Sequence, residues 1–543
     1  MMEKSLSRRS FLKASAATAG GAAAASMLAA CGGAGAADSG SKKKVLRFAQ
    51  SNAKQGLDMQ KSTNSGSSSI ADCIFESPLR WTEDNELVPC LLKEIPTFEA
   101  DGVTLHCELK PNIKFHDGTT LTASDVKYSF ERMFKPETGG KSTYMYDLIK
   151  GAKEMLAGTA TELEGLTVED DTHFTFVLTN PMVTFVNNLG INYADIFPKD
   201  ACEKAGKSWG TGTNCIGTGK YKVVSNDDTT EVVLARFDDY HDGKPALDEV
   251  HFQFVDDLNT KMMSFKNGDV DYCDLDASQL QQYKNDPAVK DLITQYPTLG
   301  VQFVNLNLSS EKLQDVRVRK ALSLAINRDE LIQSIVGGAG TVPSGWLAPQ
   351  TPGHDPNAPA FEYDPEKAKA LLAEAGVTNL ELSAKVRANI NQKQLVAVQD
   401  YWSKIGVKLT VETEDNGVWA QDWADGSLEI TAVGWFPLYA DADNHMYTYF
   451  YSENAKGKSS FYNNPEFDAL VSQARVEQDK QKRADLYRQA DDILTRQDYA
   501  TLPLYYPKNQ FVAKDYVQNA KVGNLIYHMM DVDIDTTKPD YAG

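Results

Sequence analysis

The sequence predicts an α/β protein that is built from more than one lobe. Segments with the alternating apolar and polar pattern of strands are interleaved with segments that have the spacing of amphipathic helices, and this irregular mixture indicates α/β or mixed α+β lobes. The chain has 543 residues, which is too long for one hydrophobic core. We therefore expect two or three domains.

Residues 1–30 have the features of an export signal. Arg8 and Arg9 precede a weakly apolar stretch, which is too short and too rich in glycine for a permanent membrane span. Leu28-Ala29-Ala30-Cys31 closes the stretch. The segment resembles a twin-arginine signal ending in a bacterial lipobox, which implies a diacylglycerol on Cys31. The alternative is a disordered Ala-rich tail.

Residues 31–44 form a tether in this interpretation. The segment is rich in Gly, Ala and Ser and ends in three lysines, a composition typical of a flexible linker. Two acyl chains are enough for stable anchoring. We therefore expect an extracytoplasmic protein held at the cell membrane.

Five segments have the pattern of strands, and three have the signals of helix starts. The expected strands are Val45–Gln50, Val103–Leu109, Phe174–Leu178, Glu249–Val255 and Val301–Leu308. One helix is expected over Leu121–Phe134, with Thr122 and Asp125 as a capping box. Two others are expected after Asp364-Pro365 and Asn464-Pro465, where a capping side chain precedes a proline at the first helical position.

Charge and cysteine content limit the function classes. The formal net charge of −20 repels phosphate backbones and argues against nucleic-acid binding. Six cysteines remain besides Cys31, an even number that permits disulfides in an exported protein. Cys202–Cys215 is the favoured pair, and free buried thiols are the alternative.

Four motifs in a fixed order carry a family resemblance. They are Lys114–Phe130, which contains His116-Asp117-Gly118, then Ile216–Tyr221, Asp315–Arg328 and Tyr462–Leu470. In this order and at these separations they resemble bacterial extracellular solute-binding protein family 5, the peptide- and nickel-binding proteins of ABC importers. The resemblance covers nearly the whole chain after the tether.

The resemblance implies a periplasmic-binding-protein-like fold of two lobes with a hinge and an extra domain. Lobe I would comprise residues 45–76, 216–300 and 509–543. The extra domain would comprise residues 77–215, and lobe II residues 301–508. A hinge allows two lobes to close over a bound solute.

The resemblance also implies a pocket around the strand Gly434-Trp435-Phe436. This strand would pair with a peptide backbone, and Trp435 and Trp419 would line the pocket. Ordinary core packing is the alternative for both tryptophans.

The amino end of a peptide lacks its usual partner in this sequence. Peptide binders of the family carry an aspartate three residues after the pocket tryptophan, whereas this chain has Leu438, followed by Tyr439. Either Asp441 reaches the ligand's ammonium from a differently shaped loop, or the ligand has no amine there, since a buried unpaired cation is costly.

The carboxylate end has two candidates, Lys385 and Arg387. They match the stretch where dipeptide binders carry an arginine for the ligand's carboxylate, and guanidinium suits that bidentate task. Alternate strand residues face one side, so both could contribute. An exposed basic pair is the alternative.

We expect a monomeric binding protein rather than an enzyme, with no cofactor and no metal site. HExxH and GxSxG are absent, and the eight histidines are scattered singly. His445 is the one histidine near enough to touch a metal chelate, although we expect it at the surface. The resemblance implies peptide uptake with importer permease and ATPase subunits. The alternatives are a non-peptide solute (a nickel chelate, a sugar or an amine-free acid) and an exported sensor or hydrolase.

Overall fold

The computed structural model describes residues 42–51, 56–387, 392–523 and 527–543. The export signal, Cys31 and most of the tether lie outside these residues. In the described part of the chain no helix is both long and apolar enough to span a membrane.

One large mixed sheet of 12 strands organises the chain. Its main path runs β15-β14-β16-β12-β17-β10-β1-β9-β8-β7, and β11 and β13 pair with β17 outside this path. In that order the strands are β15 (Lys408–Glu414), β14 (Glu381–Arg387), β16 (Ile430–Trp435), β12 (Val301–Leu306), β17 (Thr501–Ala513), β10 (Tyr272–Leu275), β1 (Val45–Gln50), β9 (Glu249–Phe254), β8 (Glu231–Arg236) and β7 (Tyr221–Asp227), with β11 (Ile293–Pro297) and β13 (Gly340–Thr341).

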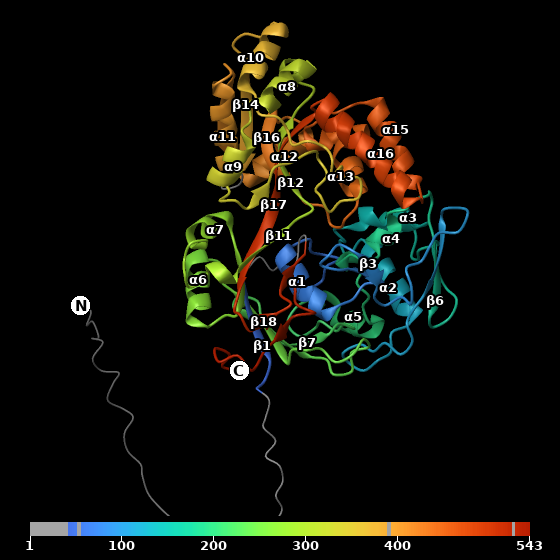
Figure 1. Cartoon of the computed structure of the whole chain (residues 1–543). Helices are drawn as coiled ribbons and strands as arrows, with labels where there is room; N and C mark the ends of the chain where they lie inside the picture. The colour runs from blue at the N-terminus through green and yellow to red at the C-terminus, as the bar shows by residue number, and fades with distance from the viewer. Residues whose placement is uncertain (1–41, 52–55, 388–391, 524–526) are drawn as a thin grey trace, which may run out of the picture. The chain divides into compact units, whose positions relative to one another are not determined.

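Strand β17 joins the two halves of this sheet (Figure 1). Residues 501–505 pair antiparallel with β12, whereas residues 508–513 pair with β11 and β10. Both predicted crossings, at residues 301 and 508, therefore lie where β12 and β17 run between the halves. The division into lobe I, lobe II and the extra domain stays a prediction, and these names are kept below for the residue ranges given above.

The apolar clusters follow the same division with one exception. Two clusters lie wholly within residues 301–506. A third cluster, however, contains residues of β1, of the predicted extra domain and of the end of the chain up to residue 541, together with Tyr439. The extra domain thus shares its core with lobe I.

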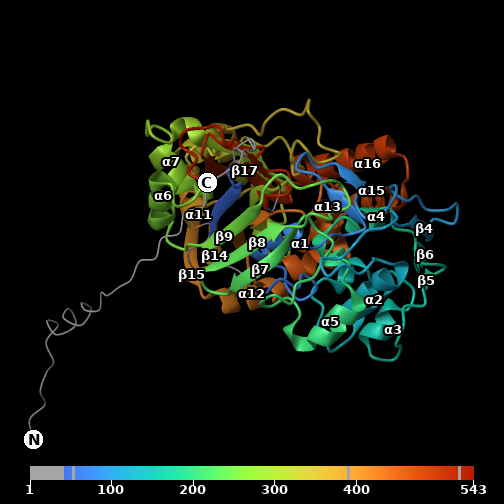
Figure 2. The same cartoon turned by 90° about the horizontal axis from the view of Figure 1, so that it is seen from below.

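The extra domain contains two small sheets and several helices. β4 (Thr104–Glu108), β6 (His173–Val177) and β5 (Leu166–Val168) form one antiparallel sheet, and β2 (Leu79–Trp81) pairs with β3 (Leu87–Pro89). Its helices α2, α3 and α5 lie to one side of β7, β8 and β9 (Figure 2). The helices of this domain are α2 (Ala123–Phe134), α3 (Ala152–Leu156), α4 (Phe185–Asn188), α5 (Lys199–Ala205) and the 3₁₀ turn η2 (Asn192–Ala194).

Other helices cover the sheet or border the loops of the cleft. They are α1 (Ser65–Ile74), α6 (Leu258–Asn267), α7 (Ala277–Tyr283), α8 (Val316–Leu324), α9 (Arg328–Ser334), α10 (Pro365–Glu374), α11 (Gln392–Ser403), α12 (Asn416–Asp425), α13 (Ala442–Phe450), α14 (Ser452–Ala455), α15 (Pro465–Val476) and α16 (Lys480–Asp492). Together with the strands they confirm the α/β class.

The local helix signals are confirmed. Thr122 caps α2, and the Asp125 carboxylate accepts its backbone N–H at 3.0 Å. Asp364 and Asn464 cap α10 and α15, each followed by a proline. These short-range patterns fix where each helix begins because they satisfy backbone N–H groups that have no partner within the helix.

The favoured disulfide was wrong. All six described cysteines are buried, and no disulfide joins Cys202 to Cys215. Both belong to the apolar cluster that lobe I shares with the extra domain. The core is extensive enough that these cysteines act as small apolar side chains.

Candidate functional site

The end of β16 offers an edge on which an extended ligand could add. Val433, Gly434 and Trp435 pair with β12 on one side. On the other side β14 pairs with β16 only at Ala384–Ile430, and no described strand continues that ladder to Trp435. An extended peptide hydrogen-bonds naturally to such an edge.

The ring of Phe436 packs closely on two glycines at this edge. A Cβ added at Gly300 would lie 2.4 Å from the Phe436 ring, and one added at Gly434 would lie 2.8 Å from it. Trp435 is half-buried, and its indole N–H donates to the Asn444 carbonyl at 3.2 Å. Gly434, Trp435 and Phe436 thus lie at the end of β16, and their contact with a ligand stays a prediction.

Trp419 forms a platform beneath Arg387. The indole N–H of Trp419 lies 3.3 Å from both the Lys385 carbonyl and the Thr431 hydroxyl, so the ring bridges β14 and β16. The Arg387 guanidinium lies 4.6 Å from the centroid of this ring, within cation–π range. Trp419 is itself buried, which fits a positioning role beneath Arg387.

Lys385 and Arg387 share a face of β14, but their environments differ. Lys385 Nζ lies 2.7 Å from Asp422 and 2.6 Å from Glu414, and hydrogen bonds to these carboxylates raise the pKa of the Lys385 ammonium. No carboxylate in the described chain pairs with Arg387. Arg387 is therefore the stronger candidate for a ligand's carboxylate.

The Asp441 carboxylate is already occupied. It accepts two hydrogen bonds from Arg483 at 2.5 and 2.8 Å and one from the Asn187 amide at 2.8 Å. It also caps α13 through the Asp443 N–H. These contacts describe a structural ion pair between two helices, and they leave the predicted ammonium site at Asp441 without a free oxygen.

A cavity of about 120 Å³ lies beside Leu438. Its walls come from three parts of the chain: the first turns of α1, the β2 segment with η2, and the loop that follows β16. Leu438 and Tyr439 form the lobe II wall, and the Tyr439 ring stacks on Trp81 at 5.7 Å.

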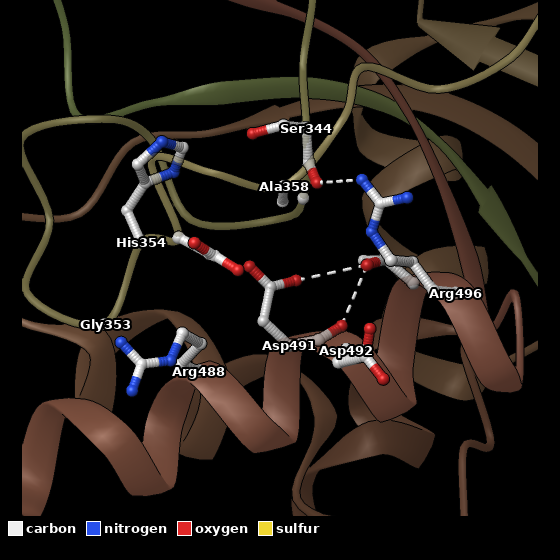
Figure 3. Close-up of a pocket in the computed structure, with 11 residues that line it drawn as sticks. Ser344, Gly353, His354, Ala358, Arg488, Asp491, Asp492 and Arg496 are labelled. Atoms are coloured by element: carbon white, nitrogen blue, oxygen red, sulfur yellow. Dashed lines mark hydrogen bonds between the residues drawn. The ribbon is translucent and has the colours of Figure 1, made fainter.

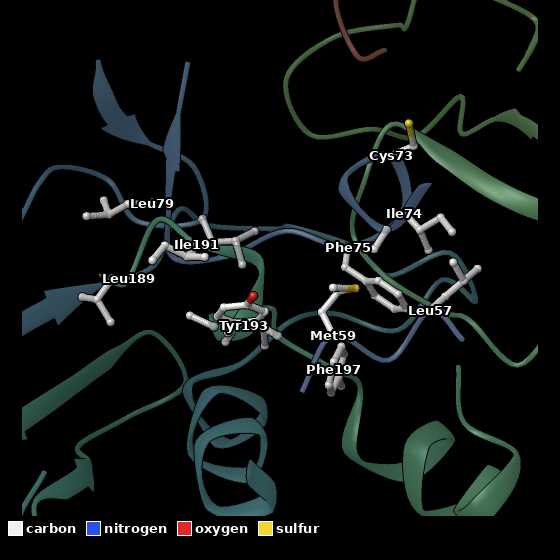
Figure 4. Packing of buried hydrophobic residues seen from close by; sticks show 14 of the residues in the cluster. Leu57, Met59, Cys73, Ile74, Phe75, Leu79, Leu189, Ile191, Tyr193 and Phe197 are labelled. Atoms are coloured by element: carbon white, nitrogen blue, oxygen red, sulfur yellow. The ribbon is translucent and has the colours of Figure 1, made fainter. Parts of the chain in front are cut away.

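The floor of this cavity belongs to the shared core of lobe I. Ile191 and Tyr193 line the cavity and pack within the same cluster as Leu79 and Leu189 (Figure 4). The floor is therefore supported by dense packing, whereas the wall at Leu438 is a loop of lobe II. A solute in the cavity would contact both lobes.

Arg80, Asp72 and His528 supply the ionic groups of the cavity. Asp72 Oδ2 lies 3.4 Å from His528 Nδ1. Arg80 precedes the stacked Trp81 in β2. No local motif indicates these three residues, and His528 lies far from Asp72 and Arg80 in the chain.

His445 was wrongly expected at the surface. Its side chain is fully buried, 6.4 Å from the Trp346 ring, and neither ring nitrogen has a hydrogen-bond partner. Burial lowers the pKa of His445 to about 3. In the part of the chain that the structure describes, no three His, Cys, Asp or Glu side chains gather as metal ligands would.

A smaller cavity of about 40 Å³ lies near α16 (Figure 3). The Asp491 carboxylate beside it accepts the backbone N–H groups of Trp346 and Leu347 at 2.8 and 3.0 Å. The Arg496 guanidinium donates to the Ser344 carbonyl. The hydrogen-bonding groups of Asp491 and Arg496 are therefore used within the protein. Their bonds hold residues 344–347 against the end of α16 and the turn that follows it.

Comparison with known proteins establishes the family. A family model described as bacterial extracellular solute-binding proteins, family 5, middle part, matches residues 86–457. The chain belongs to this family. Family 5 membership agrees with the four motifs, and it makes the chain an extracellular solute-binding protein by family.

Relatives in family 5 carry names for several solutes. The dipeptide-binding protein of Escherichia coli K12 is 29% identical over 435 residues, covering 75% of this chain and 79% of that protein. Heme-binding protein A of Haemophilus influenzae is also 29% identical, over 73% of this chain and 75% of that protein. The periplasmic oligopeptide-binding protein OppA of Salmonella typhimurium is 27% identical over 85% of this chain and 87% of that protein.

Solved structures share the fold. The unliganded open form of the periplasmic murein tripeptide binding protein MppA matches with a TM-score of 0.80 at 23% identity, covering 91% of this chain and 98% of that one. HbpA2 from Haemophilus parasuis matches with a TM-score of 0.80 at 23% identity, covering 90% and 100%. The periplasmic-binding-protein-like architecture is thus confirmed.

Proposed function

We propose that this protein captures short peptides outside the cytoplasm and delivers them to an ABC importer. The observation that carries the proposal is the edge of β16, where Val433–Trp435 pair on one side only. Peptide backbones are recognised by such pairing, and their ends are fixed by charged groups. Relatives named for dipeptides and oligopeptides support this choice.

The peptide's carboxylate end would be held by Arg387. Its guanidinium is oriented by the Trp419 ring, which is hydrogen-bonded to Thr431 in β16. A guanidinium on an aromatic platform keeps its donors directed outward, and this arrangement suits bidentate binding of a carboxylate. Lys385 would not bind the ligand directly, because its ammonium group is paired with Glu414 and Asp422.

The export part of the proposal rests on the sequence. Residues 1–30 would direct the protein to the twin-arginine route, and a lipid on Cys31 would hold it at the membrane through the tether. Metabolic labelling with a radioactive fatty acid tests this: label should enter the wild type, and a Cys31→Ala variant should be secreted unlabelled.

Calorimetric titration of Ala-Ala-Ala and its C-terminal amide tests the peptide site. In the wild type we expect the free acid to bind about tenfold or more tightly than the amide, since a hydrogen-bonded charge contributes about 1.5–3 kcal/mol. Arg387→Gln should remove that difference. Arg317→Gln, which removes an exposed arginine of α8, should retain it. Equal losses for acid and amide in Arg387→Gln would refute the carboxylate role.

A further inference from the structure

The cavity beside Leu438 contains a cation without a protein partner. Among the residues that the structure describes, none forms a hydrogen bond or an ion pair with the Arg80 guanidinium, although the side chain is half-buried and lines the cavity. A guanidinium has five N–H donors and stays charged in proteins. Donors that are partly removed from water and left unpaired are costly unless a ligand satisfies them.

The two neighbouring acids each lie beside another basic side chain, although Asp72 Oδ2 accepts no hydrogen bond from the described residues. Asp72 faces His528 at 3.4 Å, and Asp531 lies 2.7 Å from Lys220 Nζ. Leu438 stands where peptide binders resembling this chain carry the acid for an ammonium. Of the basic side chains that line this cavity, Arg80 is thus the one without a hydrogen-bond or ion-pair partner among the described residues.

The start of α1 favours the same sign of ligand charge. Ser65 and Ser68 lie about one turn apart on α1, and both line the cavity. The Ser68 hydroxyl donates to the Asn64 carbonyl at 3.1 Å and can still accept a hydrogen bond. The first turn of α1 contains no acidic residue, so the positive end of its helix dipole is not offset there. Hydroxyl groups and a helix start beside Arg80 together suit an oxyanion.

We propose that Arg80 binds a carboxylate that the solute inserts into this cavity, so that the protein prefers acidic peptides. This inference rests on the proposed peptide capture, and it specifies which peptides the protein binds most tightly. A cavity of about 120 Å³ holds roughly four water molecules, enough for a carboxyethyl group such as a glutamate side chain. Because Leu438 belongs to lobe II and Arg80 to the extra domain, an acid bound here contacts both sides of the cleft.

Calorimetric titration with matched tripeptides tests this specificity. The probes are Glu-Ala-Ala, Gln-Ala-Ala and Lys-Ala-Ala, together with Ala-Glu-Ala and Ala-Gln-Ala. Each glutamate and glutamine pair differs in charge and has nearly the same shape. The proteins are the wild type, Arg80→Gln, Arg80→Lys and the control Arg488→Gln, which removes a cation of α16 outside this cavity.

We expect one glutamate peptide to bind the wild type about tenfold or more tightly than its glutamine partner. Arg80→Gln should bring this ratio within about twofold of unity, Arg80→Lys should keep part of it, and Arg488→Gln should leave it unchanged. Thermal melting of each variant shows that it is folded, and the wild-type ratio tests the inference even where a variant does not fold.

Three results would overturn the inference. The first is equal binding of glutamate and glutamine peptides to the wild type, and the second is a preference that persists in Arg80→Gln. Preferential binding of Lys-Ala-Ala would assign the cavity to a cation facing Asp72. All three leave peptide capture standing, whereas binding of none of the five peptides would contradict the proposed function and this inference with it.

Discussion

The most unusual single residue is His445, a buried histidine with no hydrogen-bond partner in the described chain. Its pKa of about 3 lies well below the unfolded value of 6.5. Between those values the unfolded chain binds a proton that the folded chain excludes. The stability contributed by neutral His445 is thus complete above pH 6.5 and is lost as the pH falls toward 3.

The lowered pKa of His445 predicts how the free energy of unfolding changes with pH. Urea unfolding should show a free energy of unfolding that declines from pH 6.5 to 5.5, and His445→Leu should make that decline shallower by up to about 1.4 kcal/mol per pH unit. His106→Gln, at an exposed site, is the control. An unchanged slope in His445→Leu would show that His445 is protonated or hydrated in the folded protein.

The burial of a single residue could not be predicted from its neighbours in the sequence. His445 follows the pocket strand closely, and nothing nearby indicates that Trp346 covers it. Asp441 looks available in the sequence because its partner Arg483 lies 42 positions later. Lys385 and Arg387 were correctly placed on one face, but only the structure shows that two carboxylates occupy Lys385.

Among the secondary-structure elements, α13 and α16 are joined by the ion pair between Asp441 and Arg483. Both residues are largely buried, and burial of Asp443 in the same cluster raises the pKa of that carboxyl group. Removing one partner of such a pair leaves a buried charge uncompensated. The pair therefore contributes to stability rather than to ligand binding.

Asp441→Asn should lower the free energy of unfolding by about 3–5 kcal/mol. Asp485→Asn breaks an exposed pair with Arg488 on the same helix α16 and should cost less than about 1 kcal/mol. Urea denaturation measures both. A small loss of stability in Asp441→Asn, accompanied by weaker binding of peptides with free amines but not of N-acetylated ones, would restore Asp441 to the ligand site.

The boundaries of several strands and helices could be predicted from the sequence. β1 spans the predicted Val45–Gln50, and β12 begins at the predicted Val301 but ends two residues early, at Leu306. Alternation and capping are local properties, so they can be deduced from neighbouring residues. The packing of α1, β2 and β20 (Tyr527–His528) brings Asp72, Arg80 and His528 together, and no local sequence pattern encodes this packing.

At the scale of the whole molecule, a few contacts join the extra domain to lobe II across the cleft. The Asn187 amide donates to Asp441, Trp81 stacks on Tyr439, and the Val183 N–H donates to the Arg475 carbonyl at 3.2 Å. We expect such contacts to favour a closed arrangement of the lobes, which a bound solute would also favour. Closure and affinity are therefore linked.

Asn187→Ala should weaken peptide binding about fivefold, because one hydrogen bond contributes about 1 kcal/mol to the closed form. Small-angle scattering should show a larger radius of gyration for the unliganded variant than for the wild type. Gln421→Ala removes an amide that bonds within α12, and it should change neither quantity. An unchanged affinity for Asn187→Ala would mean that this contact does not bias closure.

The central claim is that the protein captures short peptides. Native mass spectrometry of the protein purified from its exported location tests it most directly, because tightly held solutes survive gentle purification and can be identified by dissociation in the instrument. We expect added masses that fragment as peptides of a few residues, with acidic residues over-represented, and that disappear after unfolding and refolding. A retained solute without peptide bonds, such as a sugar, a metal chelate or a porphyrin, would contradict it.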